Sequence, residues 1–124
     1  MFFSFDPNSS VPLFRQLRNQ VICAIARGEL HPGDHLPTIR KLAEDHELNM
    51  MTVSKAYQQL AAEGYILTDR RSGAVVAERS VTAEAHLSRE NAEELELFMA
   101  ELKLHGISDS EILVLCRQLL SSMK

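Results

Sequence analysis

The clearest structural pattern in this chain is LPTIRKLAEDHELNMMTVSKAYQQLAAEGY, which runs from Leu36 to Tyr65. Its first helical pattern has Ile39, Leu42 and Ala43 on one face, at the i, i+3, i+4 spacing of a packed helix. The apolar pattern then breaks and restarts, so two short helices are predicted with only a tight turn between them. Such a pair is the sequence pattern of a DNA-reading helix-turn-helix.

The second helix is predicted from four apolar positions at helical spacing, which are Val53, Ala56, Tyr57 and Leu60. It begins at Asn49 or at Met51-Thr52 and ends at Gly64, a residue type that commonly follows a helix end. The first helix has Thr38 as its predicted N-cap. The outward positions that such a helix presents to the major groove are Met50, Met51, Ser54, Lys55 and Gln58.

Two short β-prone runs follow the second helix. Residues 65–68 (YILT) and 74–77 (AVVA) are separated by Asp69-Arg70-Arg71-Ser72-Gly73. This pattern predicts a hairpin with two arginines at its tip, which can reach a phosphate backbone or a narrow minor groove. His35-Leu36 is a candidate for the small third strand that winged domains often add. The unit is therefore interpreted as a winged helix-turn-helix.

A scaffold helix is predicted before this motif, starting at Ser10-Val11-Pro12 and ending at Gly28. Its apolar stripe consists of Leu13, Phe14, Leu17, Val21, Ala24 and Ile25. Arg15 and Arg18 on its polar face are interpreted as solvated rather than as phosphate contacts.

The residues of this region resemble a known family. The run GELHPGDHLPTIRKLA (28–43), followed by Thr52-Val53 and AYQQLAAEG (56–64), is similar to the N-terminal domain of GntR-type bacterial transcription regulators. The similarity covers roughly residues 10–77, and the short tail resembles the YtrA-like branch of that family. The resemblance implies a winged DNA-binding domain and a tail that serves for dimerisation, without a large ligand-binding domain.

The residues predicted to bind DNA are Thr38, Arg40, Asn49, Met50, Met51, Thr52, Ser54, Lys55, Tyr57, Arg70, Arg71 and Gly73. Three of them have an alternative interpretation. Arg40 matches a family position that grips DNA, but could pair with Glu44 at i, i+4. Thr52 matches a position that faces a phosphate, but could simply cap the helix. Tyr57 belongs first to the apolar face and only second to a phosphate contact.

The two methionines and the hairpin depart from the family pattern. Polar or basic residues are more usual at Met50 and Met51, and a thioether cannot make a bidentate bond to guanine or adenine. The thioethers can instead lie against thymine methyl groups, or one of the two belongs to the core. Arg71 stands where another glycine is common, whereas Gly73 matches a family glycine.

The tail is predicted to form two helices. Ser88 to His105 is one helix, closed by Gly106, and Ser108 opens a capping box for a second helix that ends near Ser121. Their apolar stripes are too wide for a pair of helices alone. The predicted dimerisation residues are Leu95, Phe98, Met99, Leu102, Ile112, Leu115 and Leu119. The alternative is that these helices fold back on the winged domain.

The chain of 124 residues is long enough for one compact domain with an appendage. The predicted fold class is α+β, with a winged helix-turn-helix at 10–78, a linker at 79–87 and a two-helix tail at 88–124. The net charge is −4; residues 1–80 carry nine basic and nine acidic side chains, and residues 81–124 carry four and eight. The acidic excess thus lies in the tail. DNA affinity depends on where basic side chains are placed locally more than on the total charge.

Other protein classes are disfavoured. No apolar run approaches the roughly 20 residues of a membrane span, so a cytoplasmic protein is expected. Motifs of phosphate loops, nucleophile elbows and zinc proteases are missing, so we expect no enzyme, catalytic residue or cofactor. His31, His35 and His46 are interpreted as loop histidines rather than metal ligands. Cys23 and Cys116 are too far apart for a redox motif and are expected to be buried thiols.

The predicted function is a homodimeric transcription regulator, most simply a repressor, bound to an inverted-repeat operator in double-stranded DNA. Resemblance to the YtrA-like branch further implies control of an ABC transporter operon and of the regulator's own gene. No effector ligand is identified by the sequence. The alternative is a winged-helix protein-interaction module without DNA binding. A module that does not bind DNA does not require Arg40, Lys55 and the Arg70-Arg71 tip together, so their presence favours DNA binding.

Overall fold

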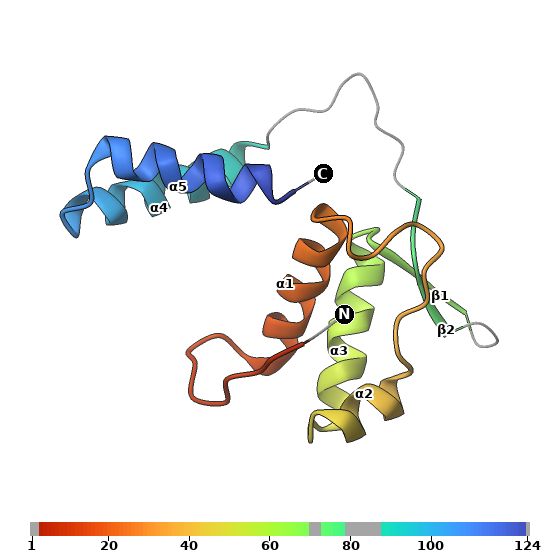
Figure 1. Ribbon diagram of the computed structural model, residues 1–124. Helices are drawn as coiled ribbons and strands as arrows, with labels where there is room; N and C mark the ends of the chain where they lie inside the picture. Colours follow the sequence, from red (N-terminus) through yellow and green to blue (C-terminus); the bar gives the residue numbers. More distant parts are fainter. Residues whose placement is uncertain (1–2, 70–72, 79–87, 124) are drawn as a thin grey trace. The chain divides into compact units, whose positions relative to one another are not determined.

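The computed structural model describes residues 3–69, 73–78 and 88–123 (Figure 1). The chain divides into two compact units, residues 1–79 and residues 80–124. The predicted linker at 79–87 lies outside the described residues. Each unit is described by itself below.

The first unit consists of three helices followed by a hairpin, as expected for a winged helix-turn-helix (Figure 1). The elements are α1 (Leu13–Ala26), α2 (Ile39–Asp45), α3 (Met50–Ala62), β1 (Ile66–Asp69) and β2 (Gly73–Val76). Their buried faces share one core, whose largest fully buried side chains are Leu17, Leu42, Leu60, Ile66, Val21, Val53 and Val76. The helical apolar spacing seen in the sequence therefore marks the inward side of each helix.

Side-chain caps define where α2 and α3 begin. The Thr38 hydroxyl accepts a hydrogen bond from the backbone N–H of Lys41 at 3.1 Å, which confirms its predicted role. The Asn49 side chain accepts one from the N–H of Met51 at 2.8 Å, so α3 begins at the earlier of the two predicted starts. Between the helices, Glu47 has a φ of 55°, the left-handed conformation that turns the chain tightly.

The hairpin is antiparallel, with Ile66 opposite Val76 and Asp69 opposite Gly73. Both strands are shifted by one residue from their predicted ranges, because Asp69 and Gly73 belong to the paired stretch. The predicted third strand is present only as a single bridge between His35 and Val75. Arg70 and Arg71, the predicted basic tip, lie outside the described residues.

The N-terminal segment belongs to the first unit, which therefore starts before the predicted residue 10. Phe3 is buried in the same core as the helices. Its segment is held on α1 because the side-chain amides of Gln16 and Gln20 bond to the backbone of Asp6 and Ser4 at 2.7 to 3.0 Å. Periodicity gives no sign of this contact, because residues 3–9 have no helical or strand pattern.

The second unit is the predicted helical hairpin of α4 (Arg89–Leu104) and α5 (Asp109–Ser121) (Figure 1). Ser88 and Ser108 cap the two helices, accepting hydrogen bonds from Asn91 and Glu111 N–H groups. No helix among the described residues has the length and apolar character that crossing a membrane requires.

The apolar residues of this hairpin are mostly on its surface. Of the seven predicted dimerisation residues, Ile112 is buried within the chain, and Met99 and Leu102 are half-buried. Ile112 is therefore corrected from an interface residue to a core residue of its own chain. The other four are exposed, namely Leu95, Phe98, Leu115 and Leu119.

Candidate nucleic-acid interface

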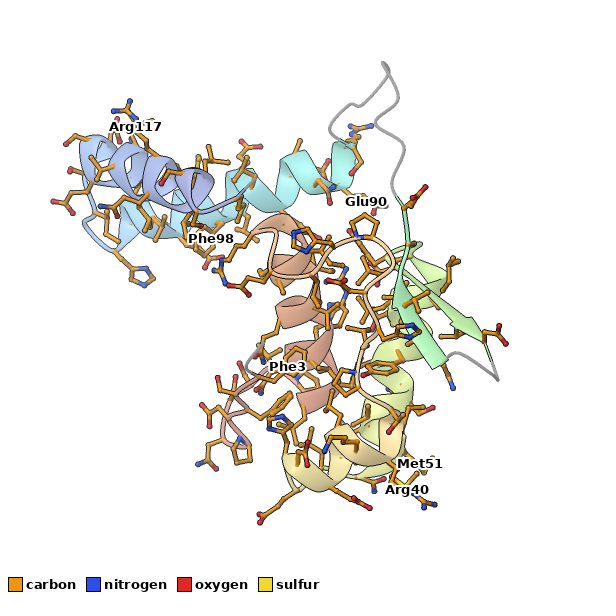
Figure 2. All side chains as sticks on the ribbon, turned by 45° about the vertical axis from the view of Figure 1, so that its right-hand side comes forward. Phe3, Arg40, Met51, Glu90, Phe98 and Arg117 are labelled. Atoms are coloured by element: carbon orange, nitrogen blue, oxygen red, sulfur yellow. The ribbon has the colours of Figure 1, made fainter. Side chains whose placement is uncertain are left out.

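Arg40 is placed on the surface where α2 meets the start of α3. Its side chain is exposed in the first turn of α2, and Figure 2 shows it at the same end of the unit as Met51. The alternative pairing with Glu44 is not formed, since no ion pair of Arg40 occurs among the described residues. Its neighbour Lys41 does pair, with Asp45 at 3.5 Å. The Arg40 guanidinium is thus available to an anion.

Both methionines at the start of α3 point out of the core. Met50 is 48% exposed and Met51 is 78% exposed. The interpretation that one of them is a core residue is therefore wrong. The opposite side of α3, with Val53 and Leu60, is fully buried. The helix accordingly presents two thioethers at its N-terminal end as an apolar, polarisable surface.

Thr52 is half-buried and does not cap the helix. Asn49 is the N-cap, and the backbone N–H of Thr52 donates to the Asn49 carbonyl at 3.0 Å. The capping alternative for Thr52 is therefore wrong. Since the N–H group has a partner within α3, a phosphate contact by this residue would use the hydroxyl.

Tyr57 has a structural role that explains its burial. Only 4% of the residue is exposed, and its hydroxyl donates a 2.6 Å hydrogen bond to the Pro37 carbonyl. Burial raises the pKa of the hydroxyl, so it stays protonated and remains a donor. The first interpretation of Tyr57, as a residue of the apolar face, is therefore confirmed, and the second one, as a DNA contact, is withdrawn because its hydroxyl holds the segment before α2.

Three predicted residues that are far apart in the sequence line one groove. Thr38 before α2, Ser54 on α3 and Gly73 at the start of β2 lie along a groove of about 480 Å³ between α3 and the hairpin. Ser54 accepts a hydrogen bond from the Gln58 amide at 3.2 Å. The fold thus brings the recognition helix and the hairpin to a common surface.

A second, open hollow lies between α3 and the first turn of α1. It has a volume of about 650 Å³, and Met51, Thr52 and Lys55 line it together with Phe14. The Lys55 ammonium lies 4.1 Å from the centroid of the Phe14 ring. From the sequence, Phe14 is predicted only as part of an apolar stripe. Helical spacing could not reveal this contact, because it joins two different helices.

The comparison with known proteins identifies the family of this chain. A family model described as bacterial regulatory proteins, gntR family, matches residues 8–76, which is more than half of the chain. The chain belongs to the GntR family. The matched residues include α1, the helix-turn-helix and the hairpin, so the resemblance stated from the sequence is confirmed.

Individual relatives place the chain on the YtrA-like side of the GntR family. It is 30% identical over 105 residues to the uncharacterized regulator YhcF of Bacillus subtilis, which covers 85% of this chain and 87% of YhcF. It is 42% identical over 77 residues to the transcriptional repressor YtrA of the same organism, covering 62% of this chain and 59% of YtrA.

The fold is also that of a solved GntR-family protein. The structure of YtrA from Sulfolobus acidocaldarius matches with a TM-score of 0.64 at 35% identity, covering 81% of this chain and 97% of that one. The relatives are named as transcription regulators and not as enzymes. The chain is accordingly a YtrA-like regulator of the GntR family.

Proposed function

We propose that this chain is a transcriptional repressor that acts in the cytoplasm and binds, as a homodimer, an operator with inverted-repeat half-sites. The observation that carries the proposal is a set of exposed side chains. Met51 and Lys55 lie on the side of α3 that faces away from the core, and Arg40 lies in the first turn of α2 at the same end of the unit as Met51 (Figure 2). In this proposal Arg40 and Lys55 contact phosphates, while the first turns of α3 enter the major groove.

The dimer is supported by the apolar surface of the tail. Phe98, which is labelled in Figure 2, belongs to α4. Its side chain is 57% exposed, and Leu95, Leu115 and Leu119 are exposed with it on the same hairpin. Exposed apolar groups gathered in this way mark an interaction surface. A two-fold dimer covers them and presents two recognition helices to an inverted repeat. By similarity to the YtrA branch, we further propose that the regulated genes are an ABC transporter operon and the regulator's own gene.

The proposal is tested by fluorescence anisotropy with a labelled DNA fragment from upstream of the chain's own gene. We expect tight binding that decreases steeply with salt, because displaced counterions drive phosphate contacts. Arg40→Ala should lower the affinity for this fragment at least tenfold. Arg27→Ala, which removes the same charge from an exposed residue after α1, is the matched control and should have little effect.

The opposite result has a clear meaning. Equal, weak binding to the upstream fragment and to unrelated DNA, indifferent to Arg40→Ala, would contradict the repressor. The protein-interaction module would then be the better account of the winged domain.

A further inference from the structure

Lys55 has an unusual partner for a lysine on a surface that is proposed to bind an anion. Its ammonium nitrogen lies 4.1 Å from the centroid of the Phe14 ring, within the range of a cation–π contact. Phe14 is half-buried in the first turn of α1 and packs against the core, so its ring is held in place. Lys55 is itself exposed on α3. A fixed ring thus supports a solvent-facing cation.

This contact holds the ammonium group without neutralising it. A ring attracts a cation through its quadrupole, whereas a carboxylate would cancel the charge. Among residues 3–69, 73–78 and 88–123, no acidic side chain forms an ion pair with Lys55. Lys41 on α2 differs, because it is paired with Asp45 at 3.5 Å. Lys55 therefore offers a full positive charge and its N–H donors to a phosphate.

The position of the pair suits a phosphate contact. Phe14 and Lys55 line the hollow of about 650 Å³ together with Met51, which is on the surface proposed to enter the major groove. When a protein surface enters the major groove, the DNA backbone phosphates lie at the edge of that surface. A free lysine loses side-chain freedom when it binds a phosphate, but a lysine already held on a ring has lost part of that freedom beforehand.

We propose that Phe14 is a positioning residue for DNA binding, which holds the Lys55 ammonium ready to contact one phosphate of the operator. Phe14 acts through Lys55 and does not itself touch DNA. The inference rests on the proposed DNA-binding function. It differs from a purely structural role, in which the ring packs α1 on α3 and the lysine merely covers it.

The test is a double-mutant cycle on DNA affinity with the full chain and an operator selected from random duplex DNA. Lys55→Gln should lower the slope of log K against log salt by about one, as expected for one lost phosphate contact. Phe14→Leu should weaken binding about two- to fivefold, the range of an exposed cation–π contact. With Lys55→Gln already present, Phe14→Leu should cause no further loss. Phe14→Tyr keeps the ring and should keep the affinity.

The matched control uses the other lysine of the motif. Phe14→Leu should keep its whole effect in the presence of Lys41→Gln, because the Lys41 charge is paired with Asp45 and not with the ring. Thermal unfolding is followed for every variant, and Phe14→Met replaces Phe14→Leu if the leucine variant does not fold.

The outcomes separate this inference from the function on which it rests. If the Phe14→Leu loss is the same with and without Lys55→Gln, or is absent, the positioning role is overturned while selective DNA binding stands. If the unaltered chain selects no DNA sequence, the proposed function is overturned, and the positioning role with it.

Discussion

Met51 combines a strongly apolar side chain with 78% exposure at the second position of a recognition helix. An amide or guanidinium at this place would read purines through two hydrogen bonds, which a thioether cannot form. The methyl group of thymine is the one major-groove feature to which a thioether is suited. We therefore predict that Met51 and its neighbour Met50, as single residues, favour a half-site rich in thymine.

We expect the thymine methyl groups themselves to contribute to binding. Replacing thymine by uracil at a contacted position of the selected operator should weaken binding about fourfold, the contribution of one buried methylene-sized group. Competition anisotropy with singly substituted duplexes measures this effect. Met51→Ala should remove the effect of uracil only at the thymine that Met51 contacts, and not at other positions of the operator. A Met51→Ala variant that stays equally sensitive to every uracil would contradict this interpretation.

Tyr57 makes a second prediction at this scale, concerning stability. Tyr57→Phe removes the hydrogen bond to the Pro37 carbonyl and leaves that oxygen without its donor. We expect the free energy of unfolding to decrease by about 1 kcal/mol, the net value of a typical hydrogen bond. Urea unfolding measures it, with an unchanged m-value showing that the unfolded surface is the same. An unchanged midpoint would mean that water replaces the hydroxyl as partner of Pro37.

At the scale of elements, α1 is joined to the end of α3 by a two-bond ion pair. The Arg18 Nε atom donates to a Glu63 carboxylate oxygen at 3.0 Å, and a terminal guanidinium nitrogen binds the other oxygen. The hydrogen bond from Arg18 is the main cause that lowers the pKa of Glu63 below its ordinary value of 4.5. The scaffold helix and the recognition helix are thus connected at the surface as well as through the core.

This ion pair should make stability depend on pH. Because the pKa of Glu63 is lower in the folded state, its contribution is complete above pH 4.5 and is lost as the pH falls through the lower folded value. We expect Glu63→Gln to lower the free energy of unfolding at pH 7 by at most about 1 kcal/mol, as for a surface pair. The gap to the unaltered chain should narrow as the pH falls below 4.5 and close only below the lower folded pKa of Glu63.

The control for this prediction is the partner residue. When Arg18→Gln is already present, Glu63→Gln should no longer produce a gap that varies with pH in this range. Thermal melts between pH 3 and pH 7 measure this gap for the unaltered chain, the two single variants and the double variant. A gap of constant size at every pH would show that Glu63 acts through packing instead of charge.

At the scale of the whole molecule, the chain joins a winged domain with a helical hairpin whose apolar side chains are largely in solvent. The winged domain buries many of its apolar residues in one core, whereas Ile112 is the only buried hydrophobic residue in the described part of the hairpin. An isolated hairpin of this kind lacks a sufficient core. We therefore expect that assembly with a second copy, as proposed above, also completes the folding of the tail.

A charge placed in the tail surface should break this assembly. Leu95, Phe98 and Leu102 share one side of α4, while Leu104 is 88% exposed on a different side. We expect light scattering to give a dimer for the unaltered chain and a monomer for Phe98→Asp. Leu104→Asp adds the same charge and should remain a dimer. A monomeric unaltered chain, or dissociation by both variants alike, would contradict the proposed interface.

The amino-acid sequence by itself determined the elements of this protein and their order. Thr38, Ser88 and Ser108 cap the helices that were predicted to follow them, and the apolar spacing in α1, α2 and α3 marked the faces that are buried. These features depend on hydrogen bonds and periodicity within a few residues. Such interactions can be recognised in a linear chain.

Only the tertiary structure decided which side chains of these elements meet. It buried Ile112 within its own hairpin, added Phe3 to the first core, gave the Tyr57 hydroxyl its partner in the Pro37 carbonyl, and placed the Phe14 ring under Lys55. Each of these results depends on a contact between segments that are far apart in the sequence. Periodicity gives the direction of a side chain relative to its own helix, but packing between elements determines what it touches.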